Sequence, residues 1–124
     1  MTLQELYQNI GGSYDQAIRV LRVEKLMDKH IRKFAQNGVV EALIEAGGTM
    51  DPADMFEKAH ALKGVSGNLG LTGFYELACE LSDEFRPGNA RKHSDAEVAA
   101  KLGEVEALYK KTTEGIRRYE ETAG

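Results

Sequence analysis

The feature that most constrains the fold is a regular apolar pattern in the last quarter of the chain. Apolar residues and one threonine recur there at alternating spacings of four and three: Val98, Leu102, Val105, Tyr109, Thr112, Ile116 and Tyr119. This spacing predicts a helix of about 25 residues, or roughly 40 Å. Ser94 and Glu97 form a capping-box pattern at its start. A helix with one long apolar side must pack lengthwise on neighbouring helices at a shallow angle.

Earlier segments have the same helical spacing. They are predicted to form a short helix ending at Gly11, a helix over 14–36 that breaks near Leu21-Arg22, and further helices ending near 47, 70 and 86. The helix over 14–36 would bury one apolar stripe: Val20, Val23, Met27, Ile31 and Phe34. The chain holds only two prolines and no strand-type alternation. We therefore expect an all-α fold, an up-down antiparallel four-helix bundle with an additional short N-terminal helix, as a single domain over 1–124.

Composition excludes several classes of protein. The net charge of −4 argues against a nucleic-acid surface, and a single cysteine, Cys79, excludes a disulfide framework within the chain. No run of about 18 apolar residues is present, and the first residues lack the build of a signal peptide. These features lead us to expect a cytoplasmic protein that binds neither membrane nor nucleic acid, and a monomer.

The stretch from Ala59 to Gly70 has an unusual helical face. Asp51 and Pro52 are suited to begin the helix that carries it, and Leu62 and Leu69 mark its core side. His60 falls on the outer side, with Gly64 one turn later and Gly67 two turns later on the same ridge. An interior helix glycine costs about 1 kcal/mol relative to alanine. Either the helix ends near Gly64, or the glycines leave room for a partner's backbone beside His60.

The residues His60-Ala61-Leu62-Lys63-Gly64, followed by Asn68-Leu69-Gly70, resemble the His-x-x-Lys-Gly motif of histidine-containing phosphotransfer domains. The similarity extends from about Tyr14 to Tyr119. It implies a helical bundle that carries a phosphoryl group on His60. It also implies partners: response-regulator receiver domains, a hybrid sensor histidine kinase, or both. The domain would have no cofactor of its own, since Mg²⁺ would sit in the partner receiver.

Two residues beside His60 have roles that fit this chemistry. An exposed imidazole is a good nucleophile at neutral pH, and phosphoryl transfer depends mainly on positioning and charge stabilisation. Lys63, one turn from His60, can pair with the phosphoryl oxygens, or it can be an ordinary surface cation. Gly64 would give the partner access.

The resemblance also suggests supporting residues. In relatives, a polar side chain 22 positions after the histidine often orients the ring, and Ser82 holds that position here. Serine is short, so Glu57 or water could take this part instead. Arg86 matches a basic residue found near the site in some members, and it also suits the C-terminal end of a helix.

The chain lacks motifs for acquiring phosphate from a nucleotide. It has no Gly-x-x-x-x-Gly-Lys-Ser/Thr loop, no kinase ATP-binding segment and no metal-ligand spacing among its histidines and cysteine. We expect a phosphoryl carrier rather than an enzyme, with His30 and His93 in solvated or boundary positions. The leading hypothesis is a phosphorelay intermediate between two receivers. The alternatives are a docking or inhibitor module that does not transfer, and a substrate domain of a histidine kinase.

Overall fold

The computed structural model describes residues 1–123, and the secondary structure in this part of the chain is entirely helical, as predicted. Seven helices follow one another along it: α1 (Leu3–Ile10), α2 (Tyr14–Leu21), α3 (Glu24–Phe34), α4 (Val39–Ala46), α5 (Pro52–Leu69), α6 (Thr72–Phe85) and α7 (Asp95–Ala123). The capping box of Ser94 and Glu97 begins α7. The Ser94 side chain accepts a hydrogen bond from the Glu97 backbone amide, and the Glu97 side chain accepts one from the Ser94 backbone amide. At 29 residues, α7 is slightly longer than predicted.

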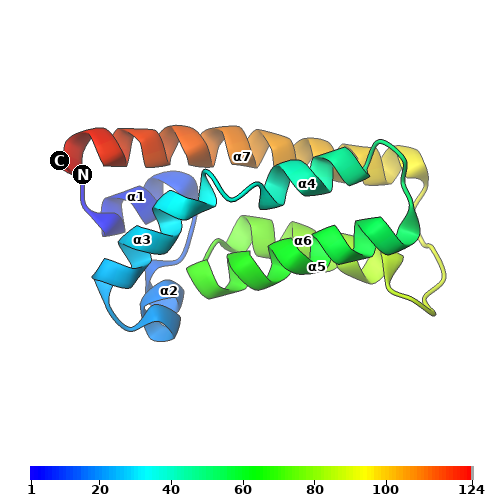
Figure 1. Ribbon diagram of the computed structural model, residues 1–124, viewed down its shortest axis with the longest axis horizontal. Helices are drawn as coiled ribbons and strands as arrows, with labels where there is room; N and C mark the ends of the chain where they lie inside the picture. Colours follow the sequence, from blue (N-terminus) through cyan, green and yellow to red (C-terminus); the bar gives the residue numbers. More distant parts are fainter. Residues whose placement is uncertain (124) are drawn as a thin grey trace.

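The helices form one bundle. Helix α5 packs along α6, and both α5 and α7 contact α4, while α6 also contacts α7. Figure 1 shows α1, α2 and α3 at one end of this bundle and the loop between α6 and α7 at the other. Met1 and the C-terminal end of α7 lie at the end that carries α1. None of the helices described combines the length and the apolar content needed to cross a membrane.

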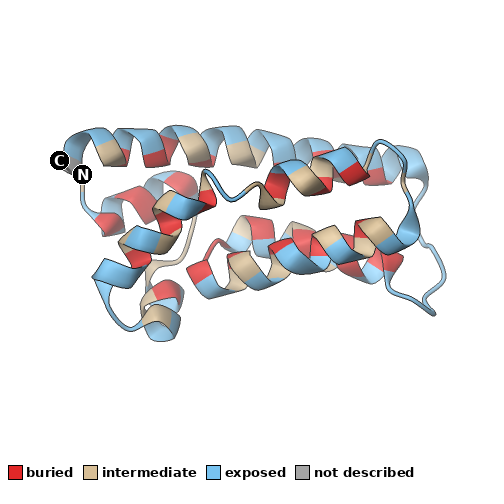
Figure 2. Cartoon of the chain, in the orientation of Figure 1, coloured by how far each residue is buried: buried red, intermediate tan, exposed pale blue. Residues whose placement is uncertain are grey.

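The core contains the predicted apolar sides of the helices. Leu3, Leu6, Tyr7 and Ile10 of α1 are all buried, and α1 packs against α7. The seam of α7 is buried too, apart from the half-buried Tyr109. Figure 2 shows exposed surface along the outer side of α7 and buried residues on the side that faces the other helices. Burial of apolar surface thus explains why these short helices hold together.

The predicted stripe over 14–36 is wrong in its first part. Met27, Ile31 and Phe34 are fully buried, but Val20 and Val23 are exposed. The chain breaks where the spacing suggested, at Arg22, which adopts a positive φ of 75°. This turn changes the direction of the chain between α2 and α3, so residues before and after it do not share one helical face. The result is that Val20 at the end of α2 and Val23 in the turn stay exposed.

Candidate functional site

Helix α5 holds His60 on its exposed side. The Asp51 side chain caps the helix by accepting a hydrogen bond from the Asp54 amide at 3.1 Å, and Pro52 occupies the first turn. The opposite side of the helix is buried in the core through Met55, Ala59, Leu62, Ser66 and Leu69. The helix continues through both internal glycines and ends at Gly70, which has a left-handed φ of 67°. The prediction that His60 faces solvent on an uninterrupted helix is therefore confirmed.

An aromatic contact orients the His60 ring. Phe56, one turn earlier on α5, stacks on it with ring centroids 5.6 Å apart and an interplanar angle of 24°. The guanidinium carbon of Arg86, at the end of α6, lies 5.5 Å from the centre of the Phe56 ring. Arg86 is also held by Asp83, whose Oδ1 lies 3.2 Å from its Nη2. The structure therefore brings His60 and Arg86 together through Phe56, a residue for which the sequence analysis proposed no role.

The supporting roles suggested for Ser82 and Glu57 do not match the structure. Ser82 is fully buried, and its hydroxyl has no hydrogen-bond partner, so it does not reach the exposed ring of His60. Glu57 is exposed and contacts Lys58, whose Nζ lies 3.4 Å from Glu57 Oε1. Within residues 1–123, no protein group forms a hydrogen bond with the His60 ring. The ring stacks on Phe56, and His60 as a whole is exposed on the surface of α5.

Lys63 and Gly64 lie beside His60 as the spacing requires. The Lys63 side chain is half-buried, and its ammonium has no ion-pair partner in the described part of the chain. Gly64 is exposed, and a Cβ placed there would have no neighbour within 4 Å. An available cation and an open helix surface thus adjoin the imidazole.

Gly67 differs from Gly64. A Cβ at position 67 would lie 3.2 Å and 3.3 Å from two atoms of the Tyr75 ring. The prediction that the ridge stays bare through Gly67 is therefore wrong, because Tyr75 of α6 covers that glycine. Gly67 allows the aromatic ring to lie close against the backbone of α5.

The comparison with protein families decides the classification. The model of the Hpt domain family matches residues 23–114, which span α3 to α6 and most of α7. The chain is an Hpt domain. Hpt domains carry phosphoryl groups on histidine in two-component phosphorelays and are carriers rather than kinases. No curated protein and no solved structure matches the chain.

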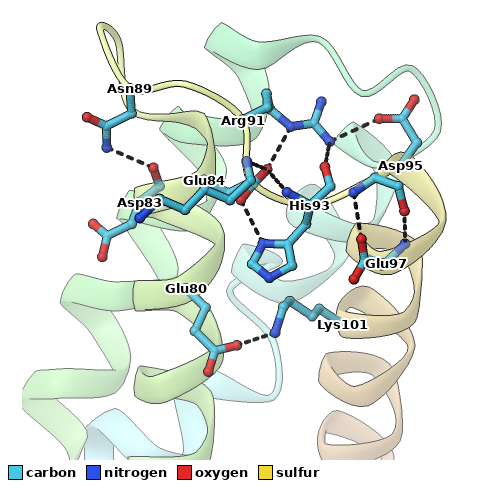
Figure 3. A network of polar contacts seen from close by, with 11 residues as sticks. Glu80, Asp83, Glu84, Asn89, Arg91, His93, Asp95, Glu97 and Lys101 are labelled. Atoms are coloured by element: carbon cyan, nitrogen blue, oxygen red, sulfur yellow. Dashed lines mark hydrogen bonds and ion pairs between the residues drawn. The ribbon is translucent and has the colours of Figure 1, made fainter.

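The loop between α6 and α7 of this Hpt domain is held by a buried carboxylate that the sequence analysis missed. Figure 3 shows Glu84 of α6 at the centre of the contacts. Glu84 Oε2 accepts hydrogen bonds from Arg91 Nε and from the amides of Lys92 and His93, at 2.9, 3.0 and 2.9 Å. Glu84 Oε1 lies 2.8 Å from His93 Nδ1. The loop is exposed, as expected, but these contacts also tie its far end to α6.

The same contacts set the charge of Glu84. Burial by itself would raise the pKa of this carboxyl, but the hydrogen bonds from His93, Arg91 and the Lys92 amide outweigh it and lower the pKa to about 2. Glu84 is therefore ionised at neutral pH. One sequence signal could have revealed that Glu84 is buried, because it lies three residues after Leu81 and seven after Leu77, on the apolar stripe of α6.

Within residues 1–123 of the Hpt domain, no group of three or more potential ligand side chains could hold a metal ion.

Proposed function

We propose that this Hpt domain accepts a phosphoryl group on His60 from the aspartyl phosphate of one receiver domain and passes it to the aspartate of another. The observation that carries the proposal is the setting of His60, an exposed imidazole. In the next turn of the same helix lie Lys63, which pairs with no carboxylate among residues 1–123, and the uncovered Gly64. A partner can reach the ring without displacing any side chain at position 64.

The transfer step follows from this setting. An unprotonated ring nitrogen of His60 attacks phosphorus, the N–P bond forms, and the P–O bond to the partner's aspartate breaks, so that the aspartate leaves as a carboxylate. The Lys63 ammonium pairs with the phosphoryl oxygens and stabilises the charge that they carry during transfer. Delivery to the second receiver is the reverse reaction at a different aspartate. Mg²⁺ belongs to the receiver's site in this proposal.

The test uses three histidine variants and two phosphoryl donors. His60→Gln should abolish labelling by a phosphorylated receiver and by phosphoramidate, a small donor that needs no docking surface. His30→Gln and His93→Gln should retain it. The label on the wild type should be acid-labile and base-stable, as expected for phosphohistidine. Because His60 is exposed, its replacement should change stability by less than about 0.5 kcal/mol.

Three results would contradict the proposal. Acid-labile label that persists in His60→Gln would place the acceptor elsewhere. Wild-type protein that binds a receiver but never becomes labelled would instead be a docking or inhibitor module. Labelling only by a histidine kinase with ATP, and by no receiver, would make the domain a kinase substrate.

A further inference from the structure

Few contacts set the orientation of the His60 ring. Among residues 1–123, no protein group forms a hydrogen bond with it, and the ring stacks on Phe56. An exposed histidine in a helix has about four side-chain orientations, since two χ1 wells are common and χ2 is roughly two-fold. Each orientation directs the ring nitrogens differently. The stack on Phe56 is therefore the contact that can select one of them.

Phe56 is itself held from a second helix. Its side chain is partly buried and packs against the hydrophobic core. The guanidinium carbon of Arg86, at the end of α6, lies 5.5 Å from the centre of the Phe56 ring, within the range of a cation–π contact. Arg86 Nη2 lies in turn 3.2 Å from Asp83 Oδ1. The core and the end of α6 thus restrain the ring on which His60 stacks.

Stacking suits an imidazole that must react. The centroids of the two rings are 5.6 Å apart and their planes differ by 24°, the geometry of an offset stack. Such a stack favours the paired orientation by about two- to tenfold over an unpaired one. It is made through the faces of the rings, whereas imidazole nitrogens react and hydrogen-bond in the ring plane. Phe56 can therefore hold the ring without engaging the atom that reacts, unlike Glu84, which binds His93 Nδ1.

We propose that Phe56 is a positioning residue for phosphoryl transfer, which holds the His60 ring in the orientation from which a nitrogen attacks phosphorus. This inference rests on the proposed function. During transfer the N–P bond forms and the bond from phosphorus to the donor breaks, and Phe56 takes part in neither. Arg86 has an indirect role, because its guanidinium holds the Phe56 ring. Orientation before the reaction raises the rate, since the reactants need not find the productive geometry.

The first test measures the labelling of His60 in Phe56→Leu and Phe56→Tyr. Leucine keeps an apolar side chain on the core but removes the ring, so labelling should slow by about fourfold, the number of orientations that then compete. Tyrosine keeps the ring and should restore the wild-type rate. Phosphoramidate needs no docking surface, so it should show the same loss as a phosphorylated receiver. Binding of the receiver should be unchanged in both variants.

Proton NMR measures the stack without any donor. The His60 ring protons should carry a ring-current shift from position 56 in the wild type and in Phe56→Tyr, and should lose it in Phe56→Leu. Phe85→Leu is the matched control, because Phe85 also lies beside an arginine, with Arg91 Cζ 4.6 Å from its ring centre. Phe85 is buried, so this variant should lower the Tm while leaving the labelling rate and the His60 shift unchanged.

Arg86→Gln tests the indirect role of the arginine. This variant should slow labelling by less than Phe56→Leu does. Combined with Phe56→Leu, it should cause no further loss, because a residue that acts through Phe56 has no effect once the ring is absent. Equal slowing by Arg86→Gln with and without Phe56 would overturn the indirect role, since Arg86 would then act on the phosphoryl group by itself.

Three results would overturn the positioning role of Phe56. One is labelling of Phe56→Leu by phosphoramidate at the wild-type rate. Another is slowing of receiver transfer alone, which would make Phe56 a docking contact. The third is a Phe56→Tyr variant as slow as Phe56→Leu, because the aromatic ring would then be irrelevant. Failure of both donors to label wild-type His60 would instead refute the proposed function, a result distinct from any difference between the variants.

Discussion

Replacement of Gly64 should raise stability and lower the transfer rate at the same time. Gly64 is an interior residue of α5, and a Cβ there would have no neighbour within 4 Å. Alanine should therefore stabilise the domain by about 1 kcal/mol, the difference in helix propensity. At about 2.1 cal/mol/K per residue, unfolding of 124 residues carries an entropy of about 0.26 kcal/mol/K, so the Tm should rise by about 4 °C.

Glutamine at position 64 should stabilise the domain by nearly as much, because it is also a good helix former and the position faces solvent. Its side chain, however, would stand one turn from His60, where a receiver must approach. A displacement of about 1 Å between reacting atoms can reduce a rate by on the order of a hundredfold. Thermal unfolding followed by circular dichroism, and the rate of transfer from a phosphorylated receiver, measure the two effects separately.

Gly103 provides a matched control. It is an exposed interior glycine of α7 and, like Gly64, has nothing within 4 Å of a Cβ. Gly103→Ala and Gly103→Gln should raise the Tm equally and leave transfer unchanged. If Gly64→Gln instead loses stability and transfer together, position 64 serves packing. If it transfers at the wild-type rate, the receiver does not cover this turn of α5.

Two further predictions concern charged residues. Lys63→Ala should slow transfer from a phosphorylated receiver without weakening receiver binding. Lys58→Ala removes a cation already paired with Asp54 and should leave the transfer rate unchanged. Equal transfer rates for the two variants would make Lys63 an ordinary surface cation. Glu84→Gln should destabilise the fold by about 2 kcal/mol at pH 7, since hydrogen bonds to a charged group are strong, whereas Glu80→Gln should have little effect. Because the pKa of Glu84 falls from 4.5 to about 2 on folding, its contribution to stability is complete above about pH 5 and is lost as the pH falls towards 2. A difference in unfolding free energy between wild type and Glu84→Gln that stays constant from pH 7 to pH 2 would refute this.

The sequence predicted the exposed face of α5 because that face depends on local rules. Asp51 and Pro52 determine where α5 begins, and the positions of Leu62 and Leu69 determine which side is buried, so the exposure of His60 follows from 3.6-residue geometry. The same rules correctly placed α6 and the seam of α7. Each of these inferences needs only residues within one helix.

The errors arose where a turn or a residue outside the helix decides the outcome. Val20 fits the stripe of a continuous helix, but the positive φ of Arg22 turns the chain before that stripe can continue. Tyr75 covers Gly67 only because the turn after α5 brings α6 back along it. Glu84 is buried because Arg91 and His93, seven and nine residues later, return to it. Spacing within a helix carries no information on these contacts.

The surroundings of His60 and His93 explain why only one of them suits a phosphoryl carrier. His93 Nδ1 is bound to Glu84, which is ionised at neutral pH. A phosphoryl group on that nitrogen would have to break this contact and lie beside a buried carboxylate. In the part of the chain that the structure describes, the His60 ring instead forms no hydrogen bond, and it lies one turn from Lys63. Stacking on Phe56 holds the ring without a hydrogen bond to either nitrogen from the described residues, which suits the phosphoryl exchange proposed for His60.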